Sequence, residues 1–548
     1  MAFLIGKLWK KEIFYILLIF GVALFARFYK LSQHPVSLSM DEVSIGYNAY
    51  SILKTGRDEW GQSFPLAFRS VGDYKPPVNI YLTVPSIAFF GLTEFAVRAP
   101  VALLGSLSVI VFIFLLKELE VKRIGYLFGG FWLAIVAWHI HFSRGSFEAV
   151  TALFFILLGV LWFLICIRKK SLIYFSFSLA LFALSLWAYH AERLFTPFFL
   201  LFLLFIYRKD LGFLVKKKEK LFISLIPFIV LIIPFIHLTF FTKVVQERAI
   251  STSILREQSL IRELNYGKYQ STGEAVFDND LYLIFRHFLG KYLNYFDLRF
   301  WFWKGMQYTP PGFLDVGLFY AVDILVILVG IYSLIIHKNK NLRSLAIFWF
   351  FVGPIPAAFT MNEQHPLRAL IWIPFFGISA AAGFEATYNF LKRNKKYLFV
   401  YVLLLLINII YFADIYLRQF PRFFSESWQY GYKEISLYVC QNQDRYDNIY
   451  ITDTFGSIVP NNTGLPGLYI LFYCKIDPTA HFTFNSGFEK IKIKRMVWDK
   501  DNFPENSLVI GSYWDLPPDK VEKSMIVKKV DYPSGKPAFI FVDTTRRS

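Results

Sequence analysis

The chain has 548 residues, of which 55% are hydrophobic and 20% aromatic, and its mean hydropathy is +0.44. Repeated apolar runs of about 20 residues exclude an ordinary soluble globular protein and predict membrane helices. The 58 Lys and Arg residues outnumber the 40 Asp and Glu residues, giving a net charge of +18. In a membrane protein this excess gathers in cytoplasmic loops, so nucleic acid is not expected as a partner. Three cysteines exclude a disulfide scaffold and a cysteine-based metal cluster.

Hydropathy along the chain predicts an α-helical polytopic membrane protein with eleven spanning segments. The expected spans are roughly 12–30, 99–117, 125–142, 147–167, 171–190, 194–207, 221–241, 313–336, 343–361, 367–388 and 397–416. The first has no small-residue cleavage site after it and is expected to remain uncleaved. Segment 78–91 is short for a membrane span and is interrupted by Pro85. Its hydropathy does not settle whether it crosses the membrane, so we use the distribution of basic residues among the loops to decide.

Basic loops decide the predicted topology. If 78–91 stays outside, six basic groups fall on one side of the membrane: 7–11, 117–123, 168–170, 207–220, 337–343 and 392–396. Counting 78–91 as a span would place the first two groups on opposite faces. The positive-inside rule therefore predicts a cytoplasmic N-terminus. The outer face receives the loops 31–98 and 242–312 together with everything after residue 417, and we expect the chemistry there.

Two outer regions have their own predicted structure. Loop 242–312 mixes aromatic and basic residues, which suits a helix lying at the membrane interface, although a simple covering of the bundle fits equally well. After residue 417 the chain turns polar, and we expect a small extracytoplasmic α/β domain over 417–548. Its predicted helix is 425–441, and its predicted strands are 448–452, 468–473, 507–513 and 538–543. A disulfide between Cys440 and Cys474 is left open.

Loop 31–98 holds two clusters of residues that can carry chemistry. Asp41 and Glu42 follow the first span closely, where adjacent carboxylates are costly unless they are paired or used. Lys75 precedes two prolines, which predicts a helix N-terminus beside an ammonium group, a favourable place for phosphate. Taken singly, the acids could just begin a juxtamembrane helix, and Lys75 could be an interfacial lysine. Together the clusters suggest group transfer from a phosphorylated lipid.

Three further segments place polar residues at the outer ends of spans: 141–148, 189–193 and 365–368. Arg144 and Glu148 could simply form a helical i,i+4 pair. Because all three segments face one compartment, we expect a common cavity for an anionic substrate. Its candidate residues are Arg144, Glu148, Tyr189, His190, Arg193, His365 and Arg368.

These motifs, in their order, resemble the GT-C glycosyltransferases over roughly residues 10–420. They are D-E at 41–42, D-Y-K-P-P at 73–77, F-x-V-R-A-P at 95–100 with Arg98, H-F-S-R-x-x-F-E, Y-H-x-x-R and H-P-L-R. The nearest resemblance is to family 39, which includes protein O-mannosyltransferases and aminoarabinose transferases of lipid A. It implies a GT-C transmembrane catalytic domain over 1–416, with Asp41 as base beside Glu42. It also implies that Lys75 and nearby arginines hold the lipid phosphate.

The resemblance implies a membrane hexosyltransferase of the cell envelope. Such an enzyme would move a sugar, with inversion, from a polyprenyl-phosphate donor to a hydroxyl of a protein, lipid or glycan. No cofactor is expected. A divalent metal is doubtful, because Tyr74 stands where some aminoarabinose transferases carry a glutamate implicated in a metal site. Glu148 stands where relatives often have Asp, which leaves its role less defined. The C-terminal region is unlike the β-trefoil domain of eukaryotic protein mannosyltransferases, so a protein acceptor does not follow.

Two other function classes remain as alternatives at this stage. A transporter or flippase for lipid-linked sugars would need ionisable residues in mid-membrane, and the candidates for this within the predicted spans are Asp315, which is near an end, and Asp323. A structural assembly protein would leave Asp41, Glu42 and Lys75 without a role. The sequence contains neither a P-loop nor a G-x-G-x-x-G motif, so a nucleotide-dependent reaction is not indicated.

Overall fold

The computed structural model describes residues 10–70, 74–216, 218–242, 252–270, 279–305, 316–361, 364–479 and 490–546. Its contacts divide the chain into two units. The first consists of Met1–Tyr29, Ala67–Asn79 and Val101–Ala413. The second consists of Lys30–Leu66, Ile80–Pro100 and Asp414–Ser548. Loop 31–98 is thus divided between the two units.

The first unit is a bundle of helices, which satisfy their backbone hydrogen bonds internally as a lipid environment requires. Its longer helices are α2 (Lys10–Phe28), α6 (Arg123–Ile135), α8 (Glu148–Lys169), α9 (Leu172–Ala188), α10 (Glu192–Ile206), α12 (Lys218–Phe241), α14 (Gln258–Gln270), α15 (Asp280–Asn294), α16 (Asp323–Ile335), α17 (Lys340–Val352) and α19 (Ile373–Arg393). Shorter elements are α7 (Ala137–Ser143), α11 (Gly212–Val215), α18 (Ile355–Ala358), η1 (Ile254–Arg256), η2 (Phe300–Lys304), η3 (Leu370–Trp372) and the paired strands β1 (Phe68–Arg69) and β2 (Tyr74–Lys75). Three helices contribute to both units: α4 (Pro77–Phe90), α5 (Glu94–Glu118) and α20 (Lys395–Asp414).

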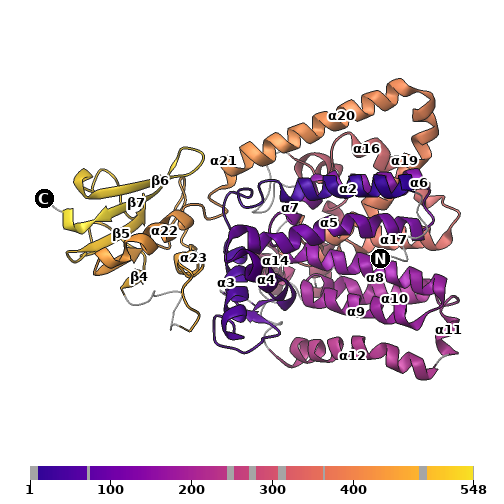
Figure 1. Ribbon diagram of the computed structural model, residues 1–548, viewed down its shortest axis with the longest axis horizontal. Coiled ribbons are helices and arrows are strands. Elements are labelled where there is room, and N and C mark those ends of the chain that lie inside the picture. Colours follow the sequence, from indigo (N-terminus) through magenta and orange to yellow (C-terminus); the bar gives the residue numbers. More distant parts are fainter. Residues whose placement is uncertain are drawn as a thin grey trace. The chain divides into compact units, whose positions relative to one another are not determined.

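The bundle is assembled by close helix pairs. Helix α9 packs against both α8 and α12, and α19 packs against both α16 and α6 (Figure 1). Two glycines lie where helix α16 approaches α19. A Cβ at Gly330 would lie 1.8 Å from the carbonyl oxygen of Ser379, and a Cβ at Gly383 would lie 1.9 Å from the carbonyl oxygen of Val326. Only a residue without a side chain permits this approach, so the two helices are fixed in register by their glycines.

Several apolar helices are long enough to cross a membrane. Among the described residues, five meet the requirements of length and composition: Glu94–Glu118, Glu148–Lys169, Glu219–Phe241, Leu370–Arg393 and Lys395–Phe424. A sixth is added if α6 and α7, bent by 53° at their junction, form one span. The chain is therefore a membrane protein, while the expected number of eleven spans stays a prediction. In segment 313–336 the described helix α16 begins only at Asp323.

The second unit contains a five-stranded sheet in the order β4-β3-β5-β7-β6. Strand β3 runs parallel to β4 and β5, and β7 runs antiparallel to β5 and β6. Its strands are β3 (Asn448–Ile451), β4 (Ile491–Ile493), β5 (Ser507–Ser512), β6 (Ile526–Asp531) and β7 (Pro537–Asp543). Its helical elements are α3 (Met40–Thr55), η4 (Ile415–Gln419), α21 (Phe420–Phe424), α22 (Tyr432–Asn442), η5 (Gln443–Arg445), α23 (Pro466–Tyr473), η6 (Lys523–Met525) and η7 (Thr544–Arg546).

The C-terminal part differs from expectation at three places. The predicted strand 468–473 is wrong, because this segment forms helix α23, with Pro466 in its first turn. The predicted helix 425–441 begins later, at Tyr432, after Gly431 in a left-handed conformation. Strands β4 and β6 carry charged residues and were not predicted. Cys440 and Cys474 form the disulfide that the sequence left open, and it joins the ends of α22 and α23.

Helix α3 is part of a layered packing inside the second unit. Helix α22 covers the sheet through ring contacts of Tyr432 with Phe539 and of Tyr438 with Phe541 (Figure 1). Helix α23 packs on α22, and α3 packs in turn on α23. Gly46 of α3 lies so close to α23 that a Cβ there would be 2.6 Å from the ring of Phe472. The N-terminus of α3 is thus supported by the C-terminal part of the chain.

Candidate active site

The two acids at the start of α3 have different surroundings. Glu42 is buried and forms a capping box with Ser39, in which each residue hydrogen-bonds the backbone N–H of the other. Its carboxylate also receives two hydrogen bonds from Arg98, at 2.8 Å from Nε and 3.2 Å from Nη2. Asp41, one residue earlier, is exposed. Of the two, Asp41 is the carboxylate that an incoming molecule can reach.

Arg98 is fully buried and its guanidinium is committed to the protein. Besides Glu42, it donates to the carbonyl oxygens of Leu31 at 3.1 Å, Pro35 at 2.9 Å and Ser37 at 2.5 Å. It also lies 5.9 Å from the ring of Trp428. These contacts hold the segment 31–37 that leads into α3, and they favour a structural role for Arg98 and Glu42 over substrate binding.

Lys75 stands directly before a helix N-terminus, as its sequence context predicts. It lies in β2, opposite Phe68 of β1, and α4 begins two residues later at Pro77. The residue is only 7% exposed. The ring nitrogen Nε2 of His190 lies 3.2 Å from the carbonyl oxygen of Tyr74, the residue before Lys75. The first unit therefore brings Lys75 and the predicted segment 189–193 into one neighbourhood.

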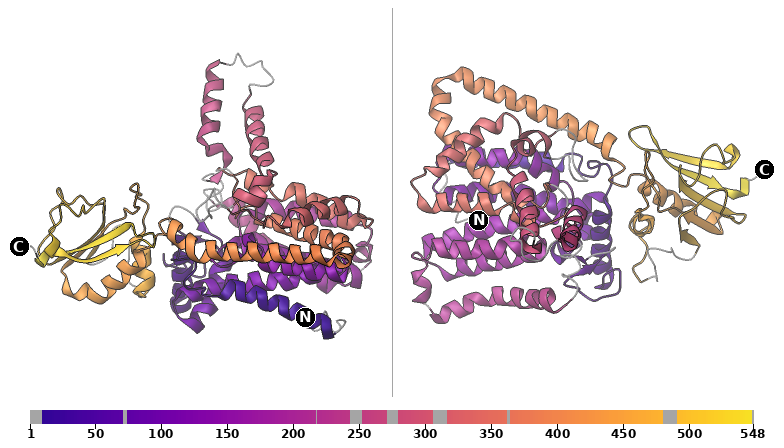
Figure 2. Two further views of the ribbon diagram at one scale, coloured as in Figure 1. Left: turned by 90° about the horizontal axis from the view of Figure 1, so that it is seen from above. Right: turned by 180° about the vertical axis from the view of Figure 1, so that it is seen from behind.

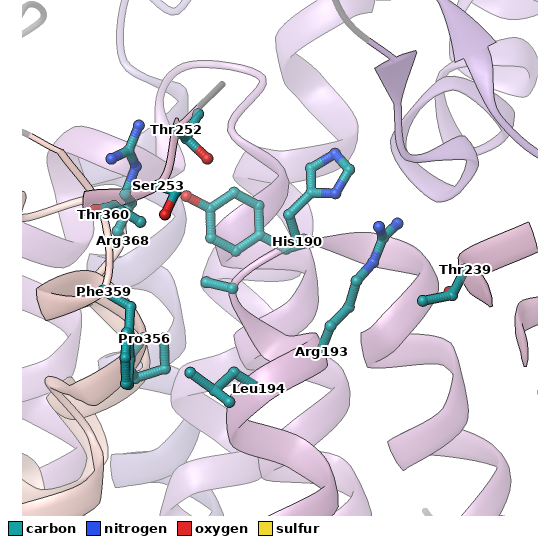
Figure 3. A pocket seen from close by; sticks show the side chains of 12 residues that line it. His190, Arg193, Leu194, Thr239, Thr252, Ser253, Pro356, Phe359, Thr360 and Arg368 are labelled. Atoms are coloured by element: carbon teal, nitrogen blue, oxygen red, sulfur yellow. The ribbon is translucent and has the colours of Figure 1, made fainter. Parts of the chain in front are cut away.

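A cavity of about 430 Å³ opens beside this neighbourhood, within the first unit. Four of the predicted residues line it, namely Tyr189, His190, Arg193 and Arg368. The remaining lining residues are Ala191, Leu194, Thr239, Thr252, Ser253, Pro356, Phe359 and Thr360. Figure 3 shows His190 and the guanidinium groups of both arginines toward one end of the cavity, with Leu194, Pro356 and Phe359 toward the other. The cavity thus has a cationic end and an apolar end.

Arg193 is the cation with the most distinctive environment. Its Nη1 atom is buried without a hydrogen-bond partner among the described residues, and the same holds for the hydroxyl of Thr239, which also lines the cavity. Burial lowers the pKa of Arg193 to about 10, so the guanidinium remains charged at neutral pH. The adjacent Glu192 is also buried, which raises its pKa to about 8 and leaves it mostly protonated. A buried cation without full compensation favours an anionic ligand.

Of the seven residues that were expected to share a cavity, Arg144, Glu148 and His365 do not line it. Arg144 donates from Nη1 to the carbonyl oxygens of Ala26 at 2.8 Å and Arg27 at 3.1 Å, and from Nη2 to that of Tyr29 at 2.7 Å. The Arg144 guanidinium therefore neutralises the partial negative charge of the carbonyl groups at the C-terminal end of α2, where a cation is favourable. Glu148 begins α8. The backbone N–H of His365 donates to the Tyr295 hydroxyl at 2.8 Å.

The serine and threonine residues of the cavity were not predicted from sequence. Thr252 and Ser253 are joined to the segment after α18 by backbone hydrogen bonds, from Met361 N–H to the Thr252 carbonyl and from Ile254 N–H to that of Phe359. No motif marks these positions, because they meet only through tertiary structure. Within the described ranges, no three His, Cys, Asp or Glu side chains converge as they would around a metal ion.

Comparison with known proteins gives a fold rather than a sequence family. No family model and no curated protein matches the chain. Among solved structures, ArnT from Cupriavidus metallidurans bound to undecaprenyl phosphate has a TM-score of 0.53 and 13% identity, over 96% of this chain and 98% of ArnT. The archaeal oligosaccharyltransferase AglB from Archaeoglobus fulgidus, in complex with an inhibitory peptide and a dolichol-phosphate, has a TM-score of 0.52 and 11% identity. That match covers 98% of this chain and 75% of AglB. Both neighbours are GT-C glycosyltransferases. This chain has the GT-C fold.

The GT-C likeness extends beyond the helical bundle. The apo form of the same ArnT matches with a TM-score of 0.52, over 96% of this chain and 97% of ArnT. The resemblance inferred from short motifs in the first 420 residues therefore agrees with a structural match over nearly the whole chain. At identities of 11–13% the match defines the fold alone. The chemistry depends on this chain's own residues in the cavity and in loop 31–98.

Proposed function

We propose that this chain is an integral-membrane inverting glycosyltransferase that uses a polyprenyl-phosphate-linked sugar as donor. The observation that carries the proposal is the cavity of the GT-C bundle, in which the buried Nη1 of Arg193 lacks a hydrogen-bond partner within the described residues. A lipid phosphate at the cationic end would compensate this charge, and Leu194, Pro356 and Phe359 would contact the first part of the prenyl chain. Arg368 and His190 supply further donors at the same end.

The proposed reaction requires one base and one group of cations. The acceptor hydroxyl oxygen attacks the anomeric carbon, the bond from that carbon to the phosphate oxygen breaks, and the phosphate monoester leaves as an anion. Asp41 takes the hydroxyl proton, since it is the exposed acid of the pair. Lys75, Arg193 and Arg368 stabilise the negative charge that grows on the leaving phosphate.

No observation gives a second function comparable support. The transporter hypothesis relied on Asp315 and Asp323. Asp315 lies outside the described residues, and Asp323 is buried with a hydrogen bond of 3.1 Å from the indole nitrogen of Trp132. Transfer of radiolabelled sugar from a polyprenyl-phosphate donor, by protein reconstituted in lipid vesicles, tests the proposed activity directly. Movement of intact donor across the vesicle membrane without transfer would contradict it.

The proposed finer assignments follow the motif resemblance. We place the chain near family 39, with a hexose donor such as those of mannosyltransferases and a hydroxyl acceptor on a protein, lipid or glycan. Mass spectrometry of glycans and glycolipids from a deletion strain would identify the sugar and the acceptor. Retention of every glycoconjugate in that strain would argue against a role in envelope glycosylation.

The first testable prediction concerns topology. We expect the N-terminus in the cytoplasm, and loop 31–98 and the C-terminal region outside. The Cys440–Cys474 disulfide supports this placement, because such bonds persist in oxidising compartments. A reporter fused after residue 94 should be active only outside the cytoplasm, and one fused after residue 170 only inside. A cytoplasmic signal from the fusion at residue 94 would contradict the topology.

The second prediction concerns the cations. Replacing Lys75 or Arg193 by Ala should raise KM for the donor and also lower kcat. Part of the contact exists in the bound donor, and part strengthens as charge develops on the phosphate. Arg299→Ala, in an exposed pair with Asp297, is the matched control and should change neither constant. Normal donor kinetics in both Lys75→Ala and Arg193→Ala would remove the cavity from the proposed mechanism.

A further inference from the structure

Helices α14 and α15 of the first unit form a hairpin that leaves the bundle. The left panel of Figure 2 shows it projecting sideways, across the direction in which the long helices run, and the right panel shows both of its helices nearly end-on. Because the long apolar helices of the same unit cross the membrane, a hairpin perpendicular to them runs along the membrane plane. Its two helices pack against each other.

Ion pairs link the two sides of the hairpin. Glu257, the residue before α14, is paired with Lys291 and lies 3.3 Å from His287, both on α15. Lys291 is only 7% exposed. Nearer the tip, Arg286 Nη2 of α15 lies 2.8 Å from a carboxylate oxygen of Glu263 on α14. The polar face of α15 is therefore directed toward its partner helix.

The opposite face of α15 is apolar and exposed. Leu281, Phe285, Leu289 and Leu293 recur every four residues, which places them along one side of the helix. Their exposed fractions are 76%, 55%, 38% and 56%. A helical hairpin in water would bury such a stripe between its helices and expose its charges. In this hairpin Leu260 and Leu283 are buried, but the stripe on α15 stays exposed, and an exposed apolar stripe of this kind is favoured when the surrounding medium is hydrocarbon.

Helix α15 also contacts the bundle. Phe288 of α15 stacks on Phe359, which follows α18, with 4.4 Å between ring centroids. Tyr292 donates a hydrogen bond of 2.8 Å to the carbonyl oxygen of Phe351 at the end of α17. The side chains of Phe351 and Phe359 are themselves 52% and 44% exposed. Helix α15 is therefore joined, beside its exposed stripe, to partly exposed aromatic residues on the exterior of the bundle.

We propose that the apolar face of α15 docks into the lipid bilayer, so that the α14–α15 hairpin lies in the membrane surface beside the bundle. Lipid is favoured over a protein partner for two reasons. The stripe lies beside partly exposed aromatic residues of the bundle, and the ion pairs across the hairpin keep these charges off the side that would meet acyl chains. The proposal is independent of the glycosyltransferase assignment, since it concerns the surroundings of the hairpin only.

Spin-label accessibility tests the proposal on the full-length protein in lipid nanodiscs. Leu281→Cys, Phe285→Cys and Leu289→Cys are made separately, so that a folding failure in one leaves two informative positions. The background is Cys166→Ser, and no reductant is added, which preserves the Cys440–Cys474 disulfide. Val230→Cys on the exposed side of α12 is the lipid control, and Ser524→Cys, exposed near the sheet, is the water control.

Labels at 281, 285 and 289 should collide with oxygen as readily as the label at 230. Their collision with a water-soluble nickel chelate should be several-fold lower than that of the label at 524. Ready collision with the nickel chelate would show that the face is in water and would overturn the proposal. Protection from both reagents would show that a second copy or another protein covers the stripe, and this would overturn it equally. Neither outcome depends on whether the protein transfers sugar.

Discussion

Replacing Asp41 by Asn should lower sugar transfer by about 10²- to 10⁴-fold while donor binding persists. Asparagine keeps the size and shape of the side chain, so α3 and its cap stay in place. Its amide cannot take up the proton of the attacking hydroxyl group. The effect should appear in kcat, because the missing interaction exists mainly in the transition state. The measurement is transfer of labelled sugar from a polyprenyl-phosphate donor, with donor binding followed separately.

Glu42→Gln is the matched control for Asp41→Asn. It changes the neighbouring acid in the same way, but Glu42 is occupied by the Ser39 cap and by Arg98. Turnover per folded molecule should therefore fall much less in Glu42→Gln than in Asp41→Asn. Near-normal turnover of Asp41→Asn would end the catalytic assignment of this loop. Equal losses in the two variants would indicate that the acid pair is merely structural.

Replacing Arg98 by Leu should destabilise the protein by about 3–5 kcal/mol, because it leaves the Glu42 carboxylate buried without its cation. The two side chains are 0% and 2% exposed, and Arg98 also ties down three carbonyl oxygens before α3. Thermal unfolding of the solubilised protein, followed by the fluorescence of a thiol-independent dye, measures the loss.

Arg418→Leu provides the comparison for Arg98→Leu. Arg418 pairs with Asp414 one helical turn away, but its side chain is 82% exposed. An exposed pair of this kind contributes less than about 1 kcal/mol, so the unfolding temperature should hardly move. If Arg98→Leu were as stable as Arg418→Leu, the buried pair would not be what holds the approach to α3.

Much of the architecture could be predicted from sequence because its signals are local. Lys75 before two prolines predicted a helix N-terminus, and α4 begins at Pro77. Segment 468–473 was predicted wrongly because a short apolar run looks alike in a buried strand and a buried helix. Here the run packs between α3 and α22 as helix α23. Its proline at the start was the one local indication of a helix.

The candidate cavity was only partly predictable. Residues of 189–193 and 365–368 line it, and their charge made them visible in the sequence. Arg144 is equally conspicuous, yet it binds carbonyl oxygens of α2 some 115 residues away, which sequence spacing cannot reveal. Thr239, Thr252, Ser253 and Thr360 carry no distinctive pattern. They become functional candidates only because folding brings them to the lining of one cavity.

The support of α3 by α23 has a consequence for how the protein is made. The Tyr469 hydroxyl donates to the Leu38 carbonyl across 431 positions of the chain, and the Tyr47 hydroxyl donates to that of Ile476 across 429. At about 5–20 residues per second, synthesis of the intervening chain takes on the order of tens of seconds. During that interval Glu42 and Arg98, only 56 positions apart, can already pair, while the face of α3 that meets Phe472 is uncovered. The proposed base is therefore held in place late, and a chain that ends before residue 466 lacks the helix that covers this face of α3.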